Sequence, residues 1–158
     1  MLILDKSGSM GGTPWKQVQT AVIKIIEIIQ PNKKIHFQVM VYNNKAEKLK
    51  LSKDPKAANM EIKKIRAGGS TNFVATFDLI GEEFESSKIL KWLTRSRKGI
   101  LMKKAIFFLT DGCDTCNDAR AIADSKERLQ TKIQGFGREV VFHAIGTTAN
   151  YELTVGNK

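Results

Sequence analysis

With 158 residues, 42% of them hydrophobic, 12 glycines and only 3 prolines, the chain has the composition of one globular domain rather than of a fibrous or disordered protein. The apolar run from Met1 to Leu4 is too short for a signal peptide, and no stretch approaches the roughly 20 apolar residues that cross a membrane. Cys113 and Cys116 alone are too few to staple a small secreted fold. These features favour an intracellular, cytoplasmic protein.

The net charge of +10 is concentrated in one segment, from Ser86 to Lys104, which contains no acidic residue. Such a segment can attract nucleic acid, an anionic membrane or an acidic protein through its electrostatic field alone. No nucleic-acid-binding motif accompanies it, and a packed surface helix with solvated lysines is the simpler interpretation. The candidate basic contact surface consists of Lys88, Lys91, Arg95, Arg97, Lys98, Lys103 and Lys104.

The chain begins with a strand pattern and a loop. Met1 to Leu4 predicts a short buried strand that runs into a glycine-containing loop from Asp5 to Gly12. A helix is expected next, with Thr13 as its N-cap and Pro14 in its first turn. Its apolar residues recur at helical spacing until Pro31 ends the pattern.

The remaining elements alternate between strand and helix patterns. Strands that alternate with helices predict an α/β fold with a doubly wound, mostly parallel sheet and helices on both faces. No internal repeat or linker divides the chain, so one domain is expected over residues 1–158. The expected ranges are a strand at Ile35–Tyr42, a hairpin return strand at Ala46–Leu51, a helix at Pro55–Arg66, a helix carrying Phe73 to Phe84, a strand at Lys104–Thr110, a helix at Asp118–Gln134 and a strand at Glu139–Ile145.

Side chains with oxygen donors occupy three of the predicted loops. In a doubly wound sheet, ligands collect beyond the carboxyl ends of the strands, where these loops lie. Carboxylates and hydroxyls without clustered His or Cys suit Mg²⁺, with Mn²⁺ or Ca²⁺ as alternatives, rather than Zn²⁺ or copper. The donors are Asp5, Ser7 and Ser9 after the first strand, Ser70, Thr71 and Asn72 before a helix, and Asp111 after the strand that ends at Thr110.

Two local expectations accompany this predicted metal site. In an extended loop every second side chain points the same way, so Asp5, Ser7 and Ser9 would face one cation. We also expect Asp5 and Asp111 to lie in solvent-facing loops rather than in the core.

Five of these donors resemble the metal-ion-dependent adhesion site of von Willebrand factor A domains, which implies that Asp5, Ser7, Ser9, Thr71 and Asp111 are the metal ligands. The matching motifs are the D-x-S-x-S of Asp5, Ser7 and Ser9, Thr71 in a Gly-Gly context, and the T-D-G of Thr110, Asp111 and Gly112. The resemblance implies a Rossmann-like fold with strand order 3-2-1-4-5-6 and an antiparallel edge strand. It also implies that the site holds Mg²⁺ and, through it, an Asp or Glu carboxylate of a partner protein.

The resemblance is incomplete at both ends of the chain. Only four residues precede Asp5, and the last strand and helix of the family are not recognisable in residues 146–158. We therefore expect a domain that is incomplete at one or both ends.

Other polar residues have simpler interpretations than catalysis. Ser9, in Ser-Gly-Ser-Met-Gly, only imitates the G-x-S-x-G turn of a nucleophilic serine, and no phosphate-binding glycine motif is present. His36 and His143 lie in apolar strands and are expected to be packed and hydrogen-bonded. No residue stands out as a catalytic base, so the sequence does not predict an enzyme.

The loop after Asp111 contains two features with open interpretations. Cys113 and Cys116 have the spacing of a redox pair, but two neighbouring thiols, or a local disulfide that shapes the rim of the metal site, fit the context better. Asp114 and Asp118 are expected to cap the next helix rather than to add charge to the site.

Two functional hypotheses follow. The first is a divalent-metal-dependent protein-interaction domain that binds an acidic group of its partner. The alternative is a subunit that binds nucleic acid or an acidic surface through residues 86–104. Partner binding that is abolished by a chelator favours the first hypothesis. Partner binding that weakens steeply with salt concentration favours the second.

Overall fold

The computed structural model describes residues 1–29, 31–32, 35, 37–52, 54–86, 104–135 and 140–146. Within these residues, five strands form one sheet in the order β3-β2-β1-β4-β5. The pairs β1–β2, β1–β4 and β4–β5 are parallel, and β3 is antiparallel to β2 at the edge. The predicted sheet is thus confirmed as far as its fifth strand, and residues 147–158 lie outside the described part. The strands are β1 (Leu2–Asp5), β2 (Val39–Tyr42), β3 (Ala46–Lys48), β4 (Lys104–Thr110) and β5 (Val140–Gly146).

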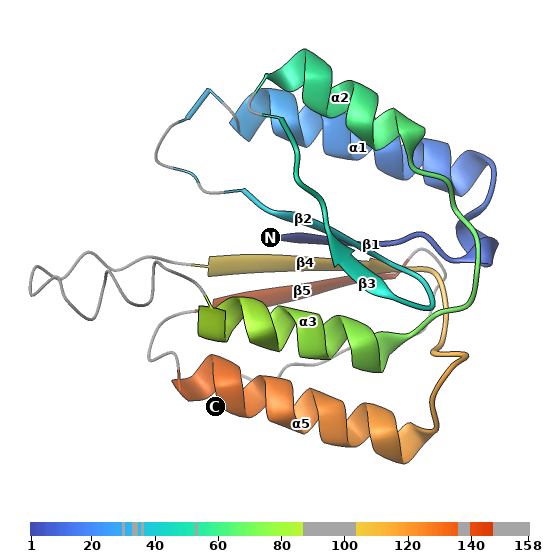
Figure 1. Ribbon diagram of the computed structural model, residues 1–158, viewed down its shortest axis with the longest axis vertical. Helices are drawn as coiled ribbons and strands as arrows, with labels where there is room; N and C mark the ends of the chain where they lie inside the picture. Colours follow the sequence, from blue (N-terminus) through green and yellow to red (C-terminus); the bar gives the residue numbers. More distant parts are fainter. Residues whose placement is uncertain are drawn as a thin grey trace, which may run out of the picture.

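Helices cover both faces of this sheet, as predicted. Figure 1 shows α1 (Thr13–Ile29) and α2 (Pro55–Lys64) on one side, and α3 (Phe73–Ser86) and α5 (Ala119–Gly135) on the other. Successive residues of a strand point to opposite faces, and β1 is buried along its whole length. Leu2 and Leu4 pack in the α1–α2 core, whereas Ile3 packs in the α3–α5 core.

The predicted strand from Ile35 begins only at Val39, so the expected start was wrong. The partner strand sets this boundary, because β1 starts at Leu2 and Leu2 pairs with Val39. Ile35 is 47% exposed. The return strand likewise ends at Lys48 rather than at Leu51, since Lys48 pairs with Met40 near the start of β2.

The helix expected to reach Arg66 ends at Lys64. Ile65 leaves the helix with an extended backbone, ψ 135°. The Trp15 indole donates a hydrogen bond to the Ile65 carbonyl at 2.9 Å, and the Gln19 amide donates to the Ile62 carbonyl at 2.7 Å. Side chains of α1 therefore satisfy the carbonyl groups that a helix leaves free at its end.

Truncating a fully buried side chain of the central strand should strongly destabilise the domain. Ile3 is 0% exposed, and Ile3→Ala should lower the free energy of unfolding by about 2–5 kcal/mol, because the surrounding core cannot fill the cavity. The matched control is Ile28→Ala on α1, where the side chain is 76% exposed and the change should stay within about 0.5 kcal/mol. Urea unfolding measures both variants, and equal losses would contradict this account of the core.

Candidate metal centre

Three loops that lie far apart in the sequence meet at the carboxyl end of the parallel strands. The first follows β1, the second connects α2 to α3, and the third follows β4. The Gly68 amide donates to the Lys6 carbonyl at 2.7 Å, and the Gly8 amide donates to the Gly69 carbonyl at 2.8 Å. These two bonds join the first loop to the second along their backbones.

Glycine is required where these two loops touch. Gly69 has a φ of 88°, and a Cβ there would lie 2.3 Å from the Asn44 side-chain oxygen. A Cβ on Gly8 would lie 3.3 Å from the Gly69 carbonyl oxygen. Larger residues would separate the loops or strain the backbone, since φ values above zero disfavour residues with a Cβ.

The Asp5 carboxylate is buried at the end of β1, with 0% exposure. Its Oδ1 accepts a hydrogen bond from the Ser7 amide at 2.8 Å. Its Oδ2 accepts from the Thr110 hydroxyl at 3.0 Å and from the Tyr42 hydroxyl at 3.2 Å. The expectation that Asp5 lies in a solvent-facing loop was therefore wrong, because β1 is central and residues from β2 and β4 enclose its last side chain.

The first loop turns rather than staying extended. Gly8–Met10 forms the short 3₁₀ helix η1, and the Met10 side chain is fully buried. The premise that alternating residues of an extended loop face one cation was wrong. Instead, the turn that begins with the Asp5–Ser7 hydrogen bond brings the Ser7 and Ser9 hydroxyls into contact.

Four of the five predicted ligands form one chain of hydrogen bonds. The Ser7 and Ser9 hydroxyl oxygens are 3.1 Å apart, and the Ser9 hydroxyl donates to Asp111 Oδ1 at 2.9 Å. Ser7 is buried, whereas Ser9 is exposed and Asp111 is half-buried. Asp5 joins the chain through the backbone amide of Ser7. Ser9 and Asp111 thus form the more exposed end of this chain.

Thr71, the fifth predicted ligand, is 4% exposed and belongs to the second loop. Its backbone is held by the third loop, because the Thr115 amide donates to the Thr71 carbonyl and the Thr71 amide donates to the Thr115 hydroxyl, both at 2.9 Å. These contacts fix the backbone of Thr71 against the third loop. Thr71 is not a member of the hydrogen-bond chain that joins the other four predicted ligands.

Asp114 also connects the third loop to the second. Its carboxylate accepts from the Phe73 amide at 2.6 Å, at the start of α3, and from the Cys116 and Asn117 amides of its own loop. The expectation that Asp114 caps the helix after it was wrong, since it caps the helix before it. Asp118 does cap the following helix, α5, through the Ala121 amide at 2.7 Å.

Hydrogen bonding shifts the acidity of Asp114. Its partial burial would raise the pKa of the carboxyl group. The hydrogen bonds from the Asn117 side chain and from the amides of Phe73, Cys116 and Asn117 outweigh burial and hold the pKa below its ordinary value of 3.8. The carboxylate is therefore the form that holds these two loops together.

The donor set fits a small divalent cation. Mg²⁺ binds oxygen ligands octahedrally at roughly 2.0–2.1 Å, which separates neighbouring ligand oxygens by about 2.9 Å; Ca²⁺ distances would separate them by roughly 3.3 Å or more. The spacings of 3.1 Å between the two serine hydroxyls and 2.9 Å between Ser9 and Asp111 are hydrogen-bond lengths, so they show that these oxygens converge and do not select between the two ions. Because Ser9 donates its one proton to Asp111, Ser7 is the donor of the contact between the two serines, and one lone pair of Ser9 remains for a cation. Within the described residues no three His, Cys, Asp or Glu side chains gather, so hydroxyl groups are essential to this candidate site.

Tyr42 is a supporting residue of this site that the sequence analysis missed. It lies fully buried and donates to Asp5, and its ring stacks on Phe108 with centroids 5.3 Å apart. Burial, and next the nearby Asp5 carboxylate, raise the pKa of the Tyr42 hydroxyl far above its ordinary value, so it remains a proton donor. In the sequence it appears only as an aromatic residue at the end of a predicted strand.

The other candidate residues lie apart from this hydrogen-bond chain. Cys113 and Cys116 are exposed and are not joined by a disulfide. His143 is exposed and stacks on Phe107, with ring centroids 5.0 Å apart, so it is less buried than expected, and His36 lies outside the described residues. Lys104 is the one described member of the basic contact surface, and its ammonium group lies 4.4 Å from the centre of the Phe84 ring.

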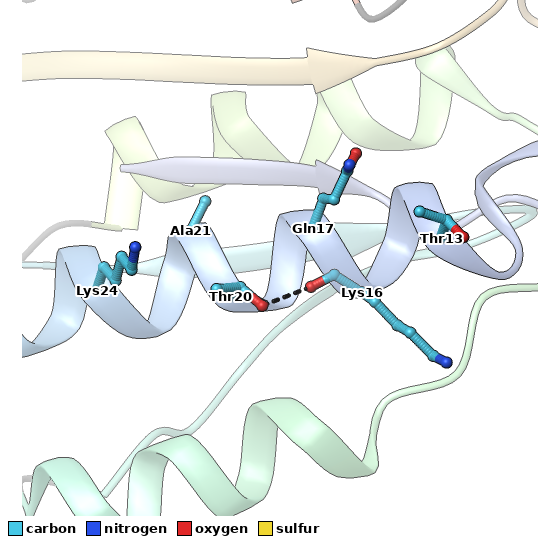
Figure 2. Close-up of a pocket in the computed structure, with 6 residues that line it drawn as sticks. All are labelled: Thr13, Lys16, Gln17, Thr20, Ala21 and Lys24. Carbon is cyan, nitrogen blue, oxygen red and sulfur yellow. Dashed lines mark hydrogen bonds between the residues drawn. The ribbon is translucent and has the colours of Figure 1, made fainter.

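An open depression runs along the outer side of α1 (Figure 2). Its described lining comes from one helix and includes no carboxylate: Thr13, Lys16, Gln17, Thr20, Ala21 and Lys24. The Thr20 hydroxyl donates to the Lys16 carbonyl at 2.8 Å, a bond within the helix. This depression has none of the convergent polar groups that mark the loops at the end of the sheet.

The comparisons with known proteins identify the family. The model of the von Willebrand factor type A domain matches residues 1–154, so the chain belongs to the von Willebrand factor type A family. Domains of this family generally mediate protein–protein interaction or adhesion. No curated protein gives a match.

Solved structures support the same fold. A von Willebrand factor type A structure from Catenulispora acidiphila is similar with a TM-score of 0.68 and 17% identity, over 96% of this chain and 33% of that one. The vWF domain of the type V pili tip protein Mfa5 from Porphyromonas gingivalis is similar with a TM-score of 0.56 and 14% identity, over 75% of this chain and 41% of that one. The chain thus spans about a third of the length of the first structure. Within the described residues, no helix is long and apolar enough to cross a membrane.

The lowered pKa of Asp114 predicts how acid weakens the loop junction. A carboxyl group with a lowered folded-state pKa contributes stability above its unfolded pKa, and this contribution is lost as the pH falls through the folded-state value. Asp114→Asn should therefore be less stable than the parent protein at pH 7, and the difference should shrink below pH 3.8. Urea midpoints of both proteins at pH 7 and at about pH 3 measure this. A difference that does not change with pH would contradict a role for the charge.

Proposed function

We propose that the chain is a divalent-metal-dependent protein-interaction domain. Mg²⁺, with Mn²⁺ or Ca²⁺ as substitutes, would be held by the hydroxyls of Ser7, Ser9 and Thr71 together with Asp5 and Asp111. The partner would be a protein that presents an Asp or Glu carboxylate to the site. The observation that carries this proposal is the continuous chain of oxygen donors from Asp5 through Ser7 and Ser9 to Asp111.

The charge balance of these donors favours an acidic partner. Two carboxylates at most oppose the two positive charges of the cation, and the Asp5 carboxylate already accepts hydrogen bonds from three protein groups. A bound cation would therefore supply an electrophilic position to which an external carboxylate oxygen can bind. Ser9 and Asp111 lie at the solvent side of the site and would border that position.

The N-terminus of α3 should attract an acidic partner less strongly than its helix dipole alone suggests. A helix N-terminus attracts anions through its free amides. Here the Phe73 amide is bonded to Asp114 and the Ala75 amide to Asn72. These bonds support a role of α3 in orienting the Thr71 loop, while the cation would attract the partner.

We propose a binding role without catalysis. The Ser9 hydroxyl donates to Asp111 and contacts Ser7, so its proton serves to hold the donor set together rather than to be removed by a base. The described histidine, His143, stacks on Phe107 in the middle of β4 rather than at the loops.

Loss of the outer donors should weaken cation binding without unfolding the domain. Ser9→Ala and Asp111→Ala should each lower Mg²⁺ affinity by at least about tenfold, or about 1.4 kcal/mol, because each removes an oxygen of the proposed ligand set. Calorimetric titration with Mg²⁺ measures the affinity, and circular dichroism checks the fold. Asp124→Ala on the exposed side of α5 is the matched control and should bind like the parent. Unchanged affinity in both site variants would remove the metal-site proposal.

Partner binding should depend on the cation and on the Thr71 hydroxyl. In a pull-down from a cell extract, partners should be retained with Mg²⁺ and lost with EDTA. Thr71→Ser keeps the hydroxyl and should retain them, whereas Thr71→Val keeps the side-chain shape and should lose them. Partners that resist EDTA but are released by moderate salt would instead favour the electrostatic alternative through residues 86–104.

A further inference from the structure

Tyr42 contacts residues that border each of the three loops of the candidate metal centre. It pairs with Asp5 in the β1–β2 ladder, and its carbonyl accepts the Lys6 amide at 2.8 Å. Its ring lies 6.1 Å from the ring of Phe73, which begins α3 two residues after Thr71. Its hydroxyl lies 3.2 Å from Asp5 Oδ2 and 3.2 Å from the Leu109 carbonyl oxygen, two residues before Asp111. One buried side chain therefore contacts the supports of all three loops.

The hydrogen bonds of Asp5 show what the Tyr42 hydroxyl does. A carboxylate offers about four acceptor positions. Three of them face protein donors here: the Ser7 amide on Oδ1, and the Thr110 and Tyr42 hydroxyls on Oδ2. Both donors on Oδ2 are contributed by neighbouring strands and approach the carboxylate from the interior. They keep this oxygen turned toward the protein.

We propose that Tyr42 is a positioning residue of the metal centre, whose hydroxyl holds the Asp5 carboxylate on the protein so that a coordination position of the cation stays available to water or a partner. This inference rests on the proposed function. With the hydroxyl present, Asp5 remains one of the groups that hold the cation, but its charge is shared with the Ser7 amide and the two hydroxyl donors. Without it, one acceptor position of Oδ2 is released and the carboxylate attracts a cation more strongly.

The test is Tyr42→Phe, which removes the hydroxyl and keeps the ring that stacks on Phe108 and Phe73. Mg²⁺ affinity, measured by calorimetry with the metal alone, should rise by about three- to tenfold, which is the range of an ordinary hydrogen bond. A full bond to a charged group would give more, but the Tyr42 proton is shared with the Leu109 carbonyl. Mn²⁺ provides a second readout, because the relaxation of water protons reports how many water molecules the ion retains. The variant should retain fewer. A purely structural role of Tyr42 would lower the affinity or leave it unchanged.

Two further positions keep the test decisive. Thr110→Val removes the other hydroxyl that donates to Asp5 Oδ2 and should also raise Mg²⁺ affinity. Thr110→Ser keeps that hydroxyl and should bind Mg²⁺ like the parent protein. These two variants replace Tyr42→Phe if it fails to fold. Ser125→Ala removes a buried hydroxyl bonded to Asp78 at 3.1 Å, between α3 and α5, and should lose stability without changing Mg²⁺ affinity.

The outcomes separate this inference from the proposed function. If the parent protein binds no Mg²⁺ or Mn²⁺, the metal centre itself is refuted. If the parent binds the metal but the folded Tyr42→Phe and Thr110→Val proteins bind it no more tightly, the role of Tyr42 is refuted and the proposed function stands.

Discussion

The buried Asp5 carboxylate is the constraint around which the loop end of this molecule is organised. An ionised carboxylate without partners is costly in a protein interior, and the cost falls only when hydrogen bonds replace its hydration. Here the donors are contributed by three segments: the Ser7 amide, the Tyr42 hydroxyl and the Thr110 hydroxyl. Because these segments belong to the first loop, β2 and β4, satisfying one charge draws the ends of three neighbouring strands together.

The same arrangement explains how Ser9 and Asp111 are held although they are less buried than Asp5. The glycine contact between the first two loops and the Asp114 and Thr115 bonds between the last two hold the backbone. Ser9 and Asp111 are joined by a hydrogen bond, and Ser9 also contacts the Ser7 hydroxyl. A site built this way rests on a buried support, which keeps the more exposed side chains in place.

The fold and the candidate site are supported by different kinds of observation. Sheet order and the family match rest on nearly the whole chain, and the structural likeness holds at 17% identity or less because strand order and core packing tolerate many sequences. The proposed binding function rests on a few side chains at one edge of the sheet. Function belongs to such sites rather than to the fold that carries them.

Local patterns in the sequence were sufficient to predict the order of strands and helices, the strand Lys104–Thr110, and the three loops that carry oxygen donors. Periodicity and turn residues act over a few neighbouring positions, so the sequence alone determines these features. The boundaries of β2, the burial of Asp5 and the direction in which Asp114 caps depended on the tertiary structure. Each is decided by a partner distant in the chain, Leu2 for Val39, Thr110 for Asp5 and Phe73 for Asp114, and these pairs meet only after the sheet has assembled.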